Sequence, residues 1–366
     1  MGEKMVGVTR FIFALFLCVS TLGFSADVSW KVVTALDAFE PFDAHVFHDG
    51  TLWVGRSRHN LGSLYKIEVY DNSGAPLFEK ELQHSPRFLY PYGAHGVLSV
   101  GISYKDNMSY YSIIERKGGK FQVTTKMIPL GAYANEWAGK PGTLYFTDPG
   151  GYDAGEPIGT TLRTLFTMRG NSFNYLAPRI PGPHHPLMVG NKLFLIEHPT
   201  IASGGRYLDL VDVNQSKPER VVTAVGSFSQ IVALDNDKLL AIADNRGDEI
   251  VLFDIASKKV LRKMSVEAGA PRSVAVMGKC LVAGAEYAKK LVFFNWSTGD
   301  KVAEWDLSGV GDKLVGISSV AADSVTGRVY VRSNNPASVT EPLKSPDRNS
   351  VLVVEETSQA TREKCN

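Results

Sequence analysis

The feature that most constrains the fold is a short, strand-like segment that occurs seven times along the chain. Each copy has five residues, most of them apolar, and successive copies begin 42 to 49 residues apart. The seven segments are 51–55, 97–101, 143–147, 192–196, 238–242, 280–284 and 328–332. A turn signal such as Asp49-Gly50 or Gly190-Asn191 precedes most of them. A repeat of this length, built of short strands and turns, is typical of a β-propeller rather than a β-sandwich.

Further strands follow within each repeat. A second apolar run comes after the first, as in 207–211 and 250–254. A tight turn and a more polar, alternating segment then end the repeat, as in 76–82 and 260–266. Together with the strand that leads into the repeated segment, this pattern predicts an all-β protein with seven four-stranded antiparallel blades.

The last repeat lacks an outer strand of its own after Glu355. The N-terminal segment 31–36, KVVTAL, closely resembles 220–225, RVVTAV, which is an outer strand in an earlier repeat. We therefore predict that the N-terminal strand pairs into the C-terminal blade and closes the ring. The alternative, six full blades and additional strands, accounts for fewer segments. Residues 27–356 are predicted to form one domain, and residues 357–366 a polar, frayed tail.

Residues 1–26 have the layout of a secretory signal peptide. Lys4 and Arg10 precede an apolar run, and small residues at Gly23, Ser25 and Ala26 offer a cleavage site. The alternative is an uncleaved membrane anchor. No later segment is long and apolar enough to span a membrane. The expected location is secreted or periplasmic.

The 39 basic and 38 acidic residues are nearly balanced, which argues against nucleic acid as the main partner. No phosphate loop, dinucleotide fingerprint, haem motif or nucleophile elbow is present, so no cofactor is predicted. We expect a monomer. Beyond residue 26, the chain has only Cys280 and Cys365, and a disulfide between them is not expected from their spacing.

The fifth and sixth repeats carry a family resemblance. Residues 239–245 and 249–254 form a strand pair, and Gly269-Ala270-Pro271-Arg272 precedes the next strand. These motifs resemble the YVTN-type repeats of secreted seven-bladed propellers, most closely in residues 226–308. The resemblance implies the fold and an extracytoplasmic location, but it does not imply one reaction.

Two kinds of loop meet on one face of a four-stranded blade: the loop before the innermost strand, and the loop between the second and third strands. These loops are longer and more polar than those on the opposite face, so ligand binding is expected there. From the first kind we select Asp43, His45, Tyr92, Glu136, His185, Gln230, Arg272 and Ser318. From the second kind we select Arg58, Asp148, Glu197, Asp244, Glu286 and Arg332.

The leading functional hypothesis is a non-catalytic binding or scaffold protein. Its polar, mixed-charge face would bind a small molecule, a glycan or a protein. Arg272 is the first choice for an anionic group, because its guanidinium pairs with carboxylate or phosphate through two hydrogen bonds. The alternative is that Arg272 neutralises Glu136 or a loop carboxylate.

Two other functions remain open. A metal-dependent, lactonase-like hydrolase would need an axial site, for which Glu136 and Asp244 offer an analogy and His184, His185 and His198 offer further ligand types. No local ligand spacing supports that site, so no metal is predicted. An adhesin would use the tripeptide Arg246-Gly247-Asp248, although a turn of this composition is expected from geometry alone.

Overall fold

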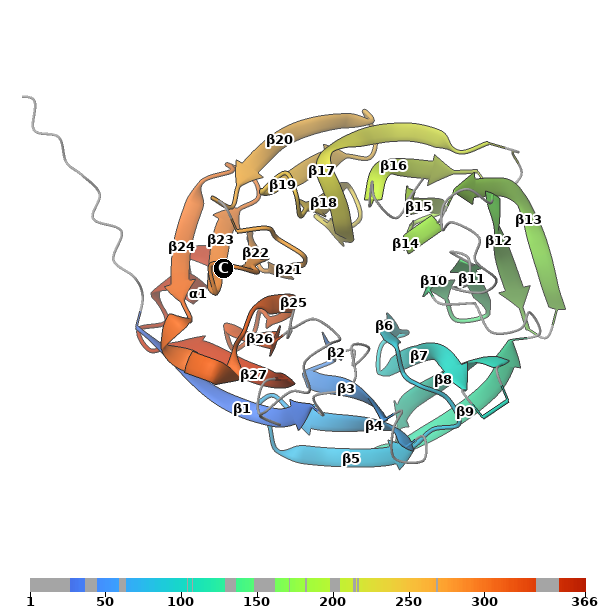
Figure 1. Cartoon of the computed structure of the whole chain (residues 1–366), viewed down its shortest axis with the longest axis horizontal. Coiled ribbons are helices and arrows are strands. Elements are labelled where there is room, and N and C mark those ends of the chain that lie inside the picture. The colour runs from blue at the N-terminus through green and yellow to red at the C-terminus, as the bar shows by residue number, and fades with distance from the viewer. Residues whose placement is uncertain are drawn as a thin grey trace, which may run out of the picture.

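The computed structural model describes residues 27–36, 45–58, 64–103, 105–106, 108–128, 136–147, 162–170, 172–181, 183–197, 205–212, 215, 217–267, 269–333 and 349–366. Within these ranges, nearly all regular structure is β-strand. The strands form six sheets, and neighbouring strands pair antiparallel (Figure 1). The prediction of an all-β, repeated architecture is confirmed at this level.

Three four-stranded sheets come first along the chain. The first sheet contains β2 (His45–His48), β3 (Thr51–Arg58), β4 (Leu64–Asp71) and β5 (Pro76–Glu81). The second sheet contains β6 (Phe88–Tyr92), β7 (Gly96–Ser103), β8 (Met108–Lys117) and β9 (Lys120–Ile128). The third sheet contains β10 (Glu136–Lys140), β11 (Thr143–Thr147), β12 (Leu162–Arg169) and β13 (Ser172–Pro181).

The next sheet has seven strands because one long strand, β17, pairs with strands on both of its sides. The sheet contains β14 (Pro183–Val189), β15 (Lys192–Glu197), β16 (Gly205–Val211), β17 (Glu219–Leu234), β18 (Leu239–Asp244), β19 (Glu249–Asp254) and β20 (Lys259–Ser265). The first part of β17 pairs with β16, and the part from Phe228 onward pairs with β18.

Two sheets complete the chain. One contains β21 (Val274–Met277), β22 (Cys280–Ala285), β23 (Lys290–Asn295) and β24 (Lys301–Asp306). The last sheet contains β25 (Ile317–Asp323), β26 (Arg328–Ser333), β27 (Asn349–Glu356) and, as its fourth strand, the N-terminal β1 (Val28–Leu36). The pairing of β1 with β27 runs from Val28 opposite Glu356 to Leu36 opposite Asn349.

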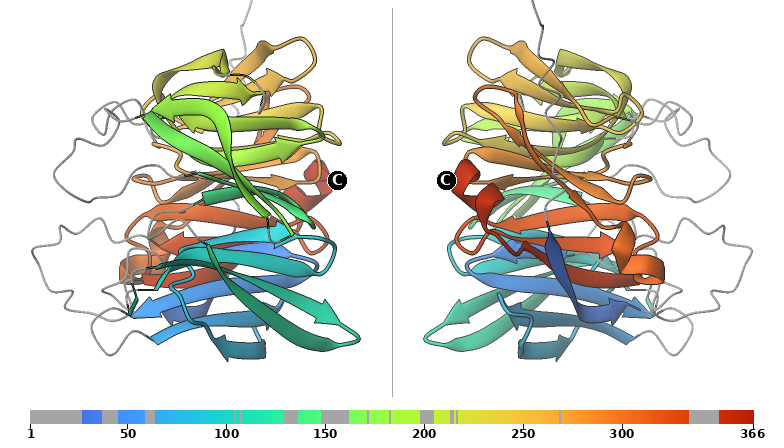
Figure 2. Two further views of the ribbon diagram at one scale, coloured as in Figure 1. Left: turned by 90° about the vertical axis from the view of Figure 1, so that its right-hand side faces the viewer. Right: turned by 90° about the vertical axis from the view of Figure 1, so that its left-hand side faces the viewer.

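The six sheets lie around a common centre. Figure 1 shows β2, β6, β10, β14, β21 and β25 toward the centre and β5, β9, β13, β20 and β24 toward the rim. The side views in Figure 2 show a molecule that is flatter along this central axis. Because the strands of adjacent sheets face each other, apolar side chains on both faces of a sheet are buried. One core cluster, for example, joins Leu252 of β19 to Leu281 and Val292 of the following sheet.

Small residues allow neighbouring sheets to approach closely near the centre. At Gly101 of β7, a Cβ atom would lie only 1.6 Å from the backbone oxygen of Ser85. At Gly284 of β22, it would lie 2.4 Å from the Ile317 side chain. Both distances are below any real Cβ contact, so β7 needs glycine where the segment before β6 crosses it, and β22 needs glycine where the next sheet packs on it.

The first and last sheets are in direct contact. The rings of Phe47 and Tyr330 stack with centroids 4.9 Å apart. Arg328 Nη1 donates to the Asn72 carbonyl oxygen at 2.7 Å. Near the central axis, Ser319 Oγ and His45 Nδ1 are 3.1 Å apart. Residues that are 274 positions apart in the sequence are therefore neighbours at this boundary.

The C-terminus differs from the expected frayed tail. Residues Ala360–Cys365 form the short helix α1, in which Thr361 and Cys365 are buried. Cys365 forms a disulfide with Cys280 of β22, so the expectation that these cysteines remain unpaired was wrong. The sequence separation of 85 residues hid the pairing, because α1 follows the last sheet and packs back against the preceding one, where it contacts β24. A 3-10 helix at Ser308–Lys313 is the other helical segment in the described ranges, and neither helix could cross a membrane.

Candidate functional site

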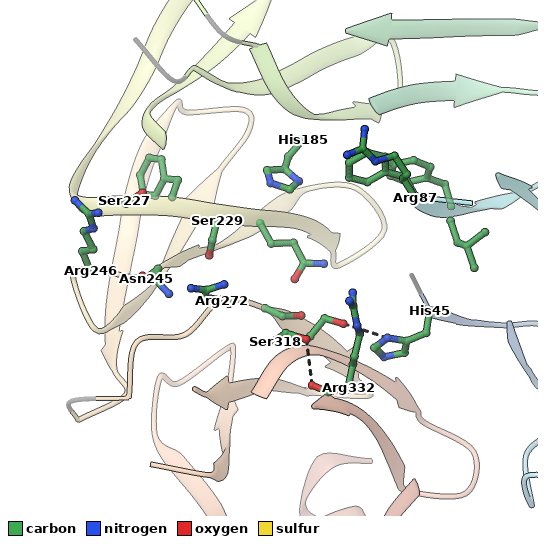
Figure 3. A pocket seen from close by; sticks show the side chains of 17 residues that line it. His45, Arg87, His185, Ser227, Ser229, Asn245, Arg246, Arg272, Ser318 and Arg332 are labelled. Atoms are coloured by element: carbon green, nitrogen blue, oxygen red, sulfur yellow. Dashed lines mark hydrogen bonds between the residues drawn. The ribbon is translucent and has the colours of Figure 1, made fainter. Parts of the chain in front are cut away.

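A pocket of about 510 Å³ lies at the centre of the molecule, on the face where the loops before the innermost strands meet those between second and third strands (Figure 3). Its volume is within the range of small-molecule sites. The described residues that line it are His45, Arg87, Phe88, Leu89, Tyr90, His185, Ser227, Phe228, Ser229, Gln230, Asn245, Arg246, Arg272, Ser273, Ser318, Ser319 and Arg332. The pocket therefore draws on the first, second and last sheets, the seven-stranded sheet and the sheet β21–β24.

The charge of this lining is strongly one-sided. Arg87, Arg246, Arg272 and Arg332 come from four different sheets, and no aspartate or glutamate is among the described lining residues. The expected mixed charge is thus replaced, in this part of the face, by a cationic pocket. Guanidinium groups offer forked donors that fit carboxylate and phosphate oxygens.

Three β-bulges shape the pocket wall. The register of β14 shifts between His184 and Leu187, that of β17 between Phe228 and Gln230, and that of β25 between Ile317 and Ser319. The residues within these shifts include three that line the pocket: His185, Ser229 and Ser318. A bulge changes the direction of the side chain at the extra residue and is over-represented beside functional sites. His185 also has a positive φ of 47°, which is unusual for a residue other than glycine.

Hydroxyl and amide groups join adjacent innermost strands beneath the arginines. Ser229 Oγ donates to the Pro271 carbonyl oxygen, and the Gln230 side-chain oxygen accepts from Val274 N at 2.8 Å. Ser273 Oγ accepts from Val320 N at 3.0 Å. The first two bonds connect the β17–β20 part of the seven-stranded sheet with β21 and the segment before it. The third bond connects β21 with β25. The pocket floor is therefore held by side chains that also line it.

Arg272 has a carboxylate partner. Its Nε lies 2.7 Å from Glu286 Oε2, and the Glu286 side chain is only 1% exposed. Both Glu286 oxygens lack a hydrogen bond of good geometry, so the contact is an ion pair without a directed hydrogen bond. The alternative for Arg272, neutralisation of a loop carboxylate, is thus present, with Glu286 as the partner. The Arg272 side chain is 44% exposed and still lines the pocket.

His45 lies on the opposite side, close to Arg332. Burial, with a smaller contribution from the Arg332 charge, lowers the pKa of His45 to about 3. The imidazole is therefore neutral at ordinary pH. Its Nδ1 contacts Ser319 Oγ, so its tautomer depends on that hydroxyl group. His45 supplies polarity to the pocket, while Arg332 supplies the positive charge.

Asp244 shapes the pocket without lining it. Its buried carboxylate accepts from the backbone N–H groups of Val225, Gly226, Ser227 and Gly247, at 2.6–3.1 Å. These four bonds fix the bend in β17 and the turn after β18, from which Ser227 and Arg246 reach the pocket. Its oxygens are therefore already engaged, which does not favour Asp244 as an axial metal ligand.

The structure brings six of the expected residues together in the pocket: His45, His185, Gln230, Arg272, Ser318 and Arg332. Asp244 and Glu286 lie behind the lining, as described above. Asp43 and Asp148 lie outside the described residues, and for Arg58 and Glu136 only the backbone in β3 and β10 is described.

Two expected residues lie elsewhere. Tyr92 ends β6 rather than preceding it, so it lies near the opposite face, where its ring packs 6.1 Å from that of Trp137. Glu197 is buried and accepts a 2.7 Å hydrogen bond from Arg220 Nη2, away from the pocket lining. The Arg220 guanidinium also stacks over the Tyr207 ring at 3.3 Å.

Arg87 was missed. It precedes β6 and occupies the position assigned to Tyr92, because the innermost strand begins at Phe88 and not after Tyr92. Arg246 was considered only as part of an adhesion tripeptide. In the structure Arg246 lines the pocket, while Asp248 Oδ1 accepts from Ala270 N at 2.8 Å. The acidic side chain of this tripeptide is therefore occupied within the fold. Spacing from the repeated segment could have identified Arg87.

A metal centre has no support in the described ranges, where no three or more His, Cys, Asp or Glu residues gather. His198 and Asp148 lie outside those ranges. Two other pockets on the opposite face, of about 350 and 560 Å³, share Tyr145, Met188 and Asn191 and contain both acidic and basic residues.

Comparison with known proteins identifies the fold but no family. No family model matches the sequence, and no curated protein matches it. Among solved structures, the chain is similar to the WD40 β-propeller domain of Doa1, with a TM-score of 0.58 and 14% identity over 91% of this chain and 99% of that one. It is also similar to a chain of the Mitotic Checkpoint Complex, with a TM-score of 0.60 and 8% identity over 96% and 99%. The fold is therefore a β-propeller; identities this low carry no statement about function.

Proposed function

We propose that this chain is an extracytoplasmic, seven-bladed β-propeller that binds an anionic small molecule in its central pocket. The observation that carries this proposal is the cationic lining, with four arginines from four sheets and no described carboxylate among the lining residues. The function is binding rather than catalysis, and the framework acts as a rigid scaffold for the pocket.

The count of seven blades rests on the long strand β17. Its first part is the outer strand for β14–β16, and its second part is the innermost strand for β18–β20. Counted in this way, the seven-stranded sheet is two blades that share one strand. Closure of the ring is supported by the pairing of β1 with β27 and by the stacking of Phe47 on Tyr330. These contacts satisfy the strand edges that an open ring would leave exposed.

The extracytoplasmic location has two independent supports. Residues 1–26 have the pattern of a signal peptide. The Cys280–Cys365 disulfide is of a kind that persists in oxidising compartments and is rare in the cytosol. The YVTN-type resemblance of residues 226–308 agrees with this location.

Anion binding follows from the electrostatics of the pocket. Guanidinium groups that line one pocket attract an anion, which can accept hydrogen bonds from them. Each charge-assisted hydrogen bond contributes roughly 1.5–3 kcal/mol. Ser and amide donors in the same lining can add neutral hydrogen bonds, so a ligand with both acidic and hydroxyl groups fits best.

The test is calorimetric titration of the full mature chain with citrate, inorganic phosphate and glucose. Citrate and phosphate should bind with an affinity that falls as salt is added, and glucose should bind more weakly. Arg246→Ala should weaken anion binding, because this exposed side chain lines the pocket. Arg116→Ala is the matched control, since Arg116 is exposed on β8 and does not line the pocket. If neither anion binds, or if Arg116→Ala weakens binding as much as Arg246→Ala, the proposal is wrong.

A further inference from the structure

A groove lies on the face opposite the central pocket, between the third sheet and the first strands of the seven-stranded sheet. It consists of the two pockets of about 350 and 560 Å³ that share Tyr145, Met188 and Asn191. Here β10 and β11 lie beside β14 (Figure 1). Tyr145 and Met188 both pack against the apolar cluster that joins the two sheets and includes Leu193. The groove therefore has an apolar floor where the sheets meet.

Two cationic residues lie next to each other along one wall of this groove. Thr143, at the start of β11, pairs with Lys140 of β10 on one side and with Arg169 of β12 on the other. Residues paired in this way point to the same face of the sheet, with Cβ atoms about 4.5–5.5 Å apart. The Cβ atoms of Lys140 and Arg169 are therefore roughly 10 Å apart, a gap that their long side chains can close above the short Thr143. All three residues line the 560 Å³ pocket.

Both cations are available to a ligand. The side chains of Lys140 and Arg169 are exposed, and neither makes a hydrogen bond, ion pair or ring contact with another residue of the described ranges. Asp237, which lines the same pocket, is likewise not paired with either of them. The positive charge at this wall is thus not neutralised within the described part of the fold.

Tyr145 occupies the next row on the same face of the third sheet. It pairs with Ala138 of β10 and Thr167 of β12, and it lies two residues after Thr143, a separation of about 7 Å along the strand. Its side chain is only partly buried, so part of the ring is open to the groove. A second aromatic ring can pack on it with centroids about 4.5–7 Å apart. A ring in this place brings a carboxylate on a short chain within reach of Lys140 and Arg169.

The charge of the whole groove favours a single anionic group. Its described lining contains three cationic residues and two acidic ones, which leaves a net charge of +1: Lys140, Arg169 and Lys192 against Asp212 and Asp237. A polyanion would meet the two carboxylates as well as the cations. A ligand with one negative charge matches the excess.

We propose that this groove binds an aromatic monocarboxylate. The carboxylate accepts hydrogen bonds from Lys140 and Arg169, and the ring packs on Tyr145 and Met188. Charge-assisted hydrogen bonds fix the position of the acid, and the forked guanidinium group fits its two oxygens. The site is separate from the central pocket and does not depend on the function proposed for that pocket.

The test compares 3-phenylpropionate with two analogues, each of which lacks one recognised part. 3-Phenylpropanol keeps the ring without the charge, and propionate keeps the charge without the ring. In ligand-observed NMR titrations of the full mature chain, 3-phenylpropionate should bind about tenfold more tightly than either analogue, because only this probe makes both the apolar and the ionic contacts.

Two conservative variants remove the cations one at a time. Lys140→Gln and Arg169→Gln should each weaken 3-phenylpropionate binding about threefold, as expected for an exposed ion pair, and leave 3-phenylpropanol binding unchanged. Lys120→Gln and Arg116→Gln are the matched controls, because these exposed residues of β9 and β8 lie outside the groove. Thermal unfolding checks that every variant is folded.

Two results would overturn this inference. One is an equal affinity of the native chain for 3-phenylpropionate and 3-phenylpropanol. The other is a loss of 3-phenylpropionate binding in Arg246→Ala but not in Arg169→Gln, which would place the probe in the central pocket. Citrate binding should be unchanged in Arg169→Gln. A failure of citrate to bind the native chain contradicts the proposed function but not the groove.

Discussion

The disulfide between Cys280 and Cys365 allows a quantitative test of how the C-terminus contributes to stability. In the chain-entropy description, a crosslink between residues 85 positions apart stabilises the native state by about 4.6 kcal/mol. Unfolding of globular proteins releases roughly 2.1 cal/mol/K per residue, or about 0.8 kcal/mol/K for this chain length. Cys365→Ser should therefore lower the melting temperature by about 6 °C.

The surroundings of α1 indicate what else is lost. Trp305 Nε1 donates to Thr361 Oγ1 at 3.1 Å, and Lys279 N donates to the Cys365 carbonyl oxygen. Without the crosslink these contacts must hold α1 alone, so its hydrogen exchange should accelerate before global unfolding. Thermal unfolding and amide exchange of native and Cys365→Ser chains measure both effects. A reductant should have no further effect on the variant. A melting temperature within about 1 °C of the native value would refute this reasoning.

Three further predictions concern the ring, a buried acid and the pocket. Deletion of 29–36 should lower the melting temperature of the whole chain, because β27 loses its antiparallel partner; an unchanged transition contradicts closure through β1. Burial raises the pKa of Asp209 to about 8, above the unfolded value of about 3.9. The native state thus keeps a proton that the unfolded chain loses, so stability falls between these pH values. The melting temperature of Asp209→Asn should therefore rise relative to that of the native chain from pH 4 to pH 8. A difference between the two melting temperatures that stays constant over this range refutes this. Arg272→Ala should lower the free energy of unfolding by about 2 kcal/mol, because the buried Glu286 loses its counter-charge. The loss is limited because solvent screens the exposed Arg272. In denaturant unfolding, the double variant Arg272→Gln/Glu286→Gln should recover most of this free energy.

The repeat could be read from the sequence because it is local. The seven segments fall on β3, β7, β11, β15, β18, β22 and β26, each the second strand in its part of a sheet. The alternation of polar and apolar residues in the outer strands, and the similarity of 31–36 to 220–225, can likewise be recognised within short stretches of sequence. The pairing of β1 with β27 agrees with the expected position of the N-terminal strand.

The pocket residues were harder to predict from the sequence, because the pocket depends on contacts between distant segments. The direction of His185 depends on a bulge in β14, and that of Ser318 on a bulge in β25. The start of β6 was expected five residues too late, so Tyr92 was selected in place of Arg87, which directly precedes Phe88. The partner of Arg272 is similarly hidden, since Glu286 follows a different strand and meets it only through the register of β21 and β22.

Different polar residues stabilise the framework and line the pocket, and this explains how a propeller can contain a cationic pocket. Asp244 and Glu286 are buried, and their charge is used within the framework, against backbone N–H groups and against Arg272. Ser229, Gln230 and Ser273 tie neighbouring innermost strands to one another. Because these bonds, the apolar layers between sheets and the disulfide hold the innermost strands in place, the pocket lining is formed before a ligand arrives. A pre-formed site of this kind binds without a large cost of reorganisation.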